Sequence, residues 1–132
     1  MDLKLSGKKA LITGASKGIG KATAKALASE GCDLILVSRT ERDLLNVKSS
    51  IEQTSSTKIC IEALDLSVSG TPEQLAKSHP EIDILVNNAG AIPGGSLEEI
   101  NEEKWRSAWD LKVFGYINMC RSFYKKMKLQ NS

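Results

Sequence analysis

The sequence predicts an α/β protein built on one doubly wound parallel sheet, for two reasons. Short apolar runs alternate with longer amphipathic segments, and this alternation is typical of strand–helix–strand units. The apolar runs are nearly continuous, as in strands that are buried on both faces of a parallel sheet. The expected strands are 9–13, 33–38, 58–63 and 82–86, and the expected helices are 18–30, 41–53, 72–78 and 98–127.

The first two helices follow their strands after short polar turns. Helix 18–30 is expected to end at Gly31, because glycine is the residue most often found just past a helix C-terminus. Its apolar spacing predicts a buried face made of Ile19, Ala22, Ala26 and Leu27. After the apolar strand DLILVS, helix 41–53 carries the expected core residues Leu44, Leu45, Val47 and Ile51.

The next elements continue the alternation. Strand 58–63 ends at Asp65-Leu66-Ser67, and helix 72–78 starts with Pro72, which is tolerated there because the first turn needs no N–H donor. Strand 82–86 runs into NNAG at residues 87–90, and the long helix 98–127 follows. We find no repeat or linker, so residues 1–132 are expected to form one domain.

The composition excludes several classes of partner. The net charge is +2, from 18 Lys and Arg against 16 Asp and Glu, which is too mild to indicate nucleic acid. No apolar stretch approaches the ~20 residues needed to cross a membrane, and the N-terminus has no signal-peptide pattern. A cytoplasmic protein is therefore expected.

The cysteines and the single histidine do not predict a metal site. Cys32, Cys60 and Cys120 are far apart and have no metal-ligand spacing, so we expect reduced, mostly buried thiols. His79 is interpreted as a loop residue before Pro80.

The most informative motif is TGASKGIG at residues 13–20, directly after an apolar strand. A glycine-rich turn that leads into a helix directs backbone N–H groups and the positive helix end toward an anion. Gly14 would permit the tight turn, Gly18 the approach of a pyrophosphate, and Gly20 close packing of the helix. The motif predicts a Rossmann-like dinucleotide-binding unit, with its ligand beyond the carboxyl ends of the strands.

The end of the second strand indicates which dinucleotide is bound. An acidic residue there would accept hydrogen bonds from the ribose 2′-hydroxyl of NAD, but positions 38–40 are Ser38, Arg39 and Thr40. Arg39 can hold a 2′-phosphate in a bidentate fork, and Lys17 can add a second cation. The sequence therefore favours NADP(H), with the alternative that both residues are ordinary surface cations.

Polar residues also follow the third and fourth strands. Asp65 can accept a hydrogen bond from the adenine amino group, or it can only stabilise a turn. Asn87 and Asn88 end a buried strand, where unpaired amides are costly, so we expect them to bond neighbouring strands and hold the cleft open.

The motifs TGASKGIG, SR, DLS and ILVNNAG together resemble the short-chain dehydrogenase/reductase family over nearly the whole chain. The resemblance implies an NADP(H)-dependent oxidoreductase that acts on a small-molecule carbonyl or alcohol and forms homo-oligomers. It also implies that the loop 91–95 touches the substrate. The implied cofactor-binding residues are Gly14, Ser16, Lys17, Gly18, Ile19, Gly20, Ser38, Arg39, Asp65, Leu66, Asn88, Ala89 and Gly90.

Two departures from this family concern catalysis. The family's long helix carries an asparagine seven residues after a tryptophan, and counting from Trp105 puts Lys112 there, whose ammonium group cannot accept a hydrogen bond. The family's catalytic serine and Tyr-x-x-x-Lys pair lie on a fifth strand and the next helix, and Ser132 stands about where that strand should begin. We therefore expect a sheet truncated after the fourth strand and the long helix, and we assign no catalytic residue.

Tyr124 and Lys128 have the family's Tyr-x-x-x-Lys spacing, but they come too soon after Asn88, so we interpret the match as coincidental. The aromatic residues of the long helix are expected to pack instead: Trp105, Trp109, Tyr116, Phe123 and Tyr124. An unpaired strand edge invites association. The alternative function is a catalytically inert dinucleotide-binding or dimerising module.

Overall fold

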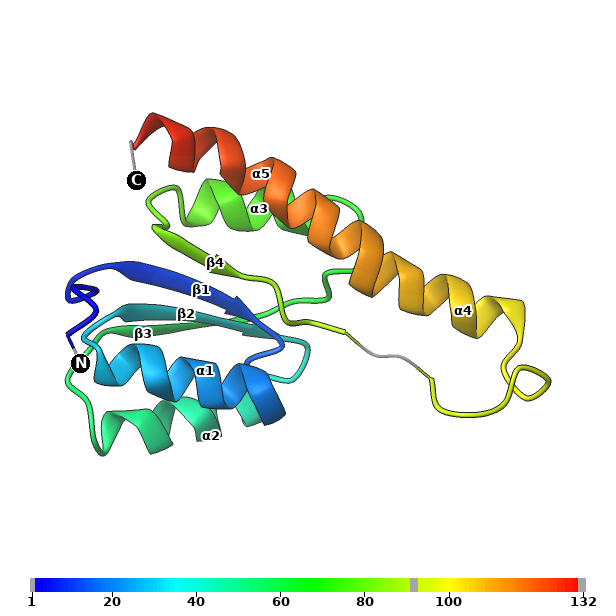
Figure 1. Cartoon of the computed structure of the whole chain (residues 1–132), viewed down its shortest axis with the longest axis horizontal. Coiled ribbons are helices and arrows are strands. Elements are labelled where there is room, and N and C mark those ends of the chain that lie inside the picture. Colours follow the sequence, from blue (N-terminus) through cyan, green and yellow to red (C-terminus); the bar gives the residue numbers. More distant parts are fainter. Residues whose placement is uncertain (1, 91–92, 131–132) are drawn as a thin grey trace.

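The computed structural model describes residues 2–90 and 93–130 and contains a parallel four-stranded sheet in the order β3-β2-β1-β4 (Figure 1). The strands are β1 (Lys9–Thr13), β2 (Asp33–Ser38), β3 (Ile59–Ala63) and β4 (Ile84–Val86). Each pair of neighbours is parallel, and the order reverses between β1 and β4. The predicted doubly wound parallel α/β sheet is confirmed.

Helices cover both faces of this sheet (Figure 1). One face carries α1 (Gly18–Ser29) and α2 (Glu41–Glu52), and the other carries α3 (Thr71–Ser78) and the C-terminal helical segment. That segment consists of α4 (Glu102–Trp109), the π-helical turn η1 (Asp110–Phe114) and α5 (Gly115–Leu129). Figure 1 shows it as one long rod whose α4 end extends beyond the sheet.

The single helix predicted over 98–127 is wrong at its start. The helix begins at Glu102, because the Asn101 side chain accepts a hydrogen bond from the Lys104 N–H at 2.9 Å and caps the first turn. Residues 96–99 form a separate turn, in which the Ser96 N–H donates to Glu99 Oε2 at 2.8 Å.

The core has two parts, one on each side of the sheet. On β1, Ala10 and Ile12 pack toward α1 and α2, whereas Leu11 packs with Met119 and Phe123 of α5, and all five side chains are fully buried. The central strand is thus covered on both faces, which explains its continuous apolar sequence.

The predicted inner face of α1 is wrong except at Leu27, which is partly buried and packs against the core. The residues buried against the sheet are Gly20, Ala24 and Ala28, whereas Ile19 is 77% exposed. Small residues face the sheet because α1 lies close to it, and the larger side chain is left outside. The predicted stop is confirmed, since Gly31 has a φ of +87° and its N–H donates to the Ala28 carbonyl at 3.0 Å.

Other expected core residues also lie outside the core. In α2, Leu44, Val47 and Ile51 are buried as predicted, but Leu45 is exposed. Phe123 is buried, whereas three other aromatic side chains of the rod that were expected to pack are exposed: Trp105, Trp109 and Tyr124.

The cysteine prediction also needs correction. Cys32 is buried, but Cys60 on the edge strand β3 and Cys120 on α5 are exposed. No helix in residues 2–90 and 93–130 is long and apolar enough to cross a membrane.

Candidate functional site

A cavity of about 480 Å³ opens where the carboxyl ends of the strands meet the start of α1. Its walls come from the glycine-rich turn, the end of β2, the segment after β3 and the NNAG segment after β4. All the predicted cofactor-binding residues except Gly20 and Asp65 line it. The long-range folding of the chain therefore brings four separate sequence motifs to one place.

The glycines of the turn differ in what they do. Gly14 has a φ of +63°, and an added Cβ would lie 2.9 Å from Asn88 Nδ2, so both backbone shape and space require glycine. At Gly20 an added Cβ would lie 2.1 Å from the Gly14 carbonyl oxygen, so the helix start fits closely over the turn. Gly18 also has a positive φ, +58°, but it faces open space with no described atom within 4 Å of an added Cβ.

The first turn of α1 offers free donors to the cavity. Lys17 is the N-cap residue and its side chain makes no capping hydrogen bond, and the first turn contains no acidic residue. The first N–H groups of a helix have no intrahelical acceptor, and the helix dipole places partial positive charge there. Together with the exposed Lys17 ammonium, this geometry suits an anion such as a pyrophosphate.

Thr13 fixes the NNAG segment to the end of β1, a role that sequence reasoning missed. Its fully buried Oγ1 accepts hydrogen bonds from the Asn88 and Ala89 N–H groups, both at 2.9 Å, and donates to the Val86 carbonyl at 3.3 Å. The Asn88 amide donates in turn to the Gly14 carbonyl at 3.2 Å. The expected bonding of Asn88 to the neighbouring strand end is confirmed.

Asn87 behaves differently from its neighbour, and the prediction that it bonds a strand is wrong. Its Nδ2 donates to the sulfur of Cys120 on α5 at 3.3 Å, because its side chain points to the helix side of the sheet. Its buried Oδ1 has no hydrogen-bond partner among the described residues. The Asn88 amide thus stabilises the glycine-rich turn, whereas the Asn87 amide connects the end of β4 to α5.

The end of β2 contributes both a buried hydroxyl and a cation. Ser38 Oγ is buried and has no hydrogen-bond partner among the residues that the structure describes, although it lies in the cavity wall. Arg39 is exposed beside it and lines the cavity. Asp43 of α2 also lines the wall, so the cavity is less cationic than the sequence at 38–40 suggested.

A second cavity of about 630 Å³ adjoins the first at Arg39, and Asp65 lies in its wall. Asp65 Oδ1 accepts hydrogen bonds from the Ser67 hydroxyl at 2.6 Å and from the Ser67 N–H at 2.9 Å. These two bonds, helped by nearby Arg39, lower the pKa of the Asp65 carboxyl. The turn role of Asp65 is therefore observed, while its contact with adenine stays a prediction.

The loop expected to touch the substrate lies partly outside the described residues, namely at 91 and 92. Its Pro93 lines the second cavity together with residues of α4. Lys112, at the position of the family's asparagine, is exposed on η1, and its stem runs beside Gly90. Tyr124 and Lys128 line neither cavity, which agrees with a coincidental spacing.

Several wall residues carry no local signal in the sequence. Leu111 reaches the first cavity from η1, and Leu64 reaches it from the segment after β3, and only tertiary packing brings them there. The cavity residues that sequence reasoning missed are Val37, Thr40, Asp43, Leu64 and Leu111.

Comparison with known proteins gives consistent matches. Residues 8–132 match the model of the short chain dehydrogenase family. The uncharacterized oxidoreductase YvaG of Bacillus subtilis is 31% identical over 128 residues, which cover 96% of this chain and 48% of that protein.

Two solved structures resemble the chain closely. L-sorbose reductase from Gluconobacter frateurii, complexed with NADPH and L-sorbose, shares 32% identity and a TM-score of 0.91, covering 98% of this chain and 51% of that one. A short chain dehydrogenase/reductase from Burkholderia phymatum, in complex with NAD, shares 29% identity and a TM-score of 0.90, covering 98% and 47%. The chain spans about half the length of the relatives it matches.

Proposed function

The chain belongs to the short-chain dehydrogenase family of oxidoreductases, and on this premise we propose that it binds NADP(H) in the 480 Å³ cavity. The bound nicotinamide supplies or accepts the hydride in the family's chemistry. The substrate would be a small-molecule carbonyl or alcohol.

The single observation that carries this proposal is the free N-terminus of α1, which faces the cavity beside Lys17 and the open backbone of Gly18. A pyrophosphate there would accept hydrogen bonds from N–H groups that have no intrahelical acceptor. The buried, unpartnered Ser38 hydroxyl adds a polar group that suits a ribose or phosphate oxygen.

The preference for NADP(H) over NAD(H) rests on Arg39 and Lys17. Both cations line the cavity wall, and no acidic residue occupies positions 38–40 to accept from a ribose 2′-hydroxyl. One of the solved relatives is complexed with NADPH and the other with NAD, so the family alone does not decide between them. Asp43 also lines the cavity, and its carboxylate would repel a 2′-phosphate and so favour NAD(H). However, Asp43 lies on α2, one turn beyond Arg39.

The remaining predicted site residues would shape the cavity. Asn88, Ala89 and Gly90 would line the side that receives the nicotinamide ribose, and Leu66 would close the wall after β3. Asp65 would orient the adenine end through its free carboxylate oxygen. Because Tyr124 and Lys128 lie outside both cavities, we assign them no part in proton transfer and expect residues 1–132 alone to show no turnover.

Binding measurements test this proposal directly. We expect calorimetric titration of the purified chain to give tighter binding of NADPH than of NADH. Replacing Arg39 by Asp removes a charge-assisted contact of about 1.5–3 kcal/mol and should weaken NADPH binding about 10- to 100-fold. Arg42→Asp is the matched control, because Arg42 is also exposed near the start of α2 but does not line the cavity.

Two results would contradict the proposal. If a folded chain binds neither nucleotide, the cavity is not a dinucleotide site by itself. If Arg39→Asp and Arg42→Asp change the NADPH affinity equally, Arg39 acts only through overall charge and the 2′-phosphate contact is refuted.

Two observations favour a second candidate, a catalytically inert module that dimerises. Lys112 replaces the family's asparagine, and the α4–α5 rod exposes large apolar side chains, including Trp109 at 54% and Phe114 at 53%. Such side chains suit a second copy of the chain, in line with the expected homo-oligomer. Size-exclusion chromatography with light scattering distinguishes a dimer from a monomer, and a monomer would refute this second candidate.

A further inference from the structure

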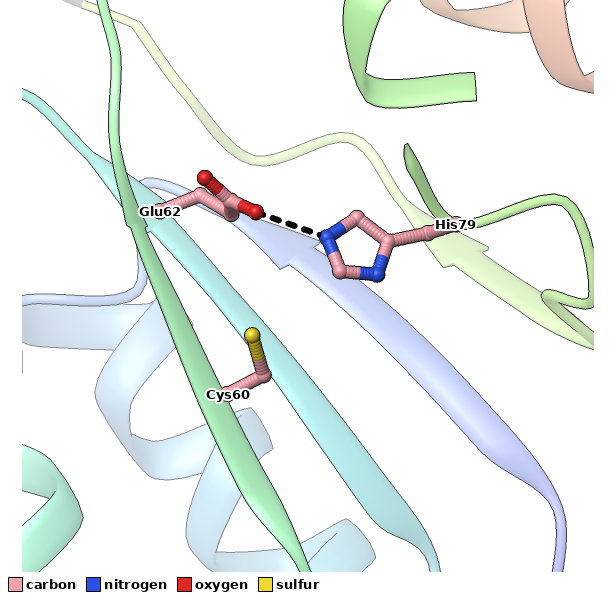
Figure 2. Close-up of side chains that lie close together, drawn as sticks. All are labelled: Cys60, Glu62 and His79. Atoms are coloured by element: carbon pink, nitrogen blue, oxygen red, sulfur yellow. Dashed lines mark hydrogen bonds and ion pairs between the residues drawn. The ribbon is translucent and has the colours of Figure 1, made fainter. Parts of the chain in front are cut away.

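A cluster of metal-ligand side chains lies apart from the two cavities at the carboxyl ends of the strands (Figure 2). Cys60 and Glu62 are two residues apart on the edge strand β3, so their side chains leave the same face of the sheet. His79 directly follows α3, which packs on that face. The Cys60 sulfur, a Glu62 carboxylate oxygen and a His79 ring nitrogen all lie within 4.8 Å of one another.

The contacts within this cluster leave the thiol free. His79 Nε2 and Glu62 Oε1 form a hydrogen bond of 2.8 Å, with side chains only 17% and 30% exposed. The Cys60 sulfur has one weak contact, 3.9 Å to the carbonyl oxygen of the next residue of its own strand. Figure 2 shows the thiol beside the Glu62–His79 pair, on the same side of β3. A structural Glu–His pair alone therefore accounts for only two of the three groups.

A thiolate, a carboxylate and an imidazole together suit a metal ion of intermediate softness such as Zn²⁺. Zn²⁺ binds thiolate sulfur at about 2.3 Å and imidazole nitrogen at about 2.0 Å, so tetrahedral ligand atoms stand roughly 3.3–3.8 Å apart. The observed separations run from 2.8 Å to at most 4.8 Å. Side-chain shifts of about 1 Å would therefore bring all three atoms to one ion. A soft thiolate with an imidazole argues against Mg²⁺ or Ca²⁺, which prefer oxygen ligands.

Access to the cluster is open. Cys60 and His79 line a cavity of about 420 Å³ whose wall also includes Lys58, Pro80 and Ile82. An ion can enter from solvent on this side without disturbing the sheet, and a water can fill the fourth ligand position.

We propose that Cys60, Glu62 and His79 form a Zn²⁺ site that joins the edge strand β3 to the end of α3. On binding, the Cys60 thiol loses its proton to solvent, and the Glu62 carboxylate exchanges its hydrogen bond to His79 for the metal.

Cobalt serves as the probe, because Co²⁺ bound to a thiolate shows a charge-transfer absorption that the aqueous ion lacks. We expect the untagged, reduced chain to develop this absorption with one equivalent of Co²⁺ and to lose it when Zn²⁺ is added. Cys60→Ser should abolish the absorption and weaken Zn²⁺ binding by more than ~10-fold, because mutating even a hydrogen-bond partner of a metal ligand typically costs about that much affinity. His79→Gln should weaken Co²⁺ binding by a similar factor.

The matched control is Cys120→Ser, which removes the other exposed thiol and leaves the cluster intact. Circular dichroism should show that every variant keeps the helix content of the parent. Absence of the absorption in the folded parent, its persistence in Cys60→Ser, or its loss in Cys120→Ser would each overturn the proposal. The titration contains no nucleotide, so its outcome is independent of NADP(H) binding.

Discussion

Replacing Gly20 by Ala tests how closely α1 must approach the turn at the end of β1. In the structure the added Cβ would lie 2.1 Å from the Gly14 carbonyl oxygen and 2.6 Å from Asn88 Nδ2. These atoms cannot move apart independently, because Asn88 Nδ2 donates to that same carbonyl at 3.2 Å. The substitution therefore forces either the helix or the Gly14–Asn88 contact to shift.

The expected cost follows from this geometry. The Cβ would be more than about 1 Å too close to a backbone atom, which belongs to the upper part of the ~1–3 kcal/mol range for overpacking. Alanine in turn stabilises a helix by about 0.5–1 kcal/mol relative to glycine. The net loss is about 2 kcal/mol, which corresponds to a Tm about 8 °C lower for a chain of this size.

Thermal unfolding followed by circular dichroism measures this loss, and Gly94→Ala provides the control. Gly94 has no described atom within 4 Å of an added Cβ and no positive φ, so its Tm should stay within about 2 °C of the parent. If Gly20→Ala unfolds at the same temperature as Gly94→Ala, the close approach of α1 to the turn is not required, and our account of this glycine is wrong.

Two further predictions concern hydrogen bonds around the site. Thr13→Val leaves the Asn88 and Ala89 N–H groups without an acceptor, and it should lower the free energy of unfolding by about 1–3 kcal/mol for each of them. Thr13→Ser keeps the hydroxyl and should lower it less. Equal losses for the two variants in urea unfolding would contradict this. Because the folded-state pKa of Asp65 is lowered, its bonds to Ser67 stabilise the fold fully above the unfolded pKa near ~3.9 and are lost as pH falls through the lower value. The stability advantage of the parent over Asp65→Ala should therefore shrink below about pH 4, and a constant difference would refute the assignment.

The parts of the fold that the sequence predicts well depend on local signals. The bounds of β1 and β2 agree with the prediction because each strand is a short apolar run between polar turns. The glycine-rich turn is equally local, since the positive φ values of Gly14 and Gly18 come from the residues themselves. The carboxyl-end cavity then follows from the rule that parallel strands end at one edge of the sheet.

The parts that the sequence could not predict depend on how distant segments meet. Ile19 is apolar and occurs at helical spacing, yet it is exposed because the sheet contacts the smaller side of α1. The hydrogen bonds of Thr13 reach residues about 75 positions later in the chain. The contact of Glu62 with His79 joins a strand to a helix end that are neighbours only after β3 and α3 have packed.

The network around Thr13, Gly14 and Asn88 links stability to the proposed cofactor binding. A ligand present at about 100 times its Kd stabilises the folded state by about 2.7 kcal/mol, which exceeds the loss expected for Gly20→Ala if that variant still binds. If the shift leaves the first-turn N–H groups of α1 in place, Gly20→Ala should thus regain its Tm when NADPH is added, and if the shift moves them, NADPH should raise its Tm less than that of the parent. Arg39→Asp should instead keep the Tm of the parent without nucleotide, because Arg39 is exposed. Its Tm should rise less than that of the parent when NADPH is added, because a ligand contact is lost. The two classes of variant therefore separate the residues that hold the cavity in shape from those that contact the nucleotide.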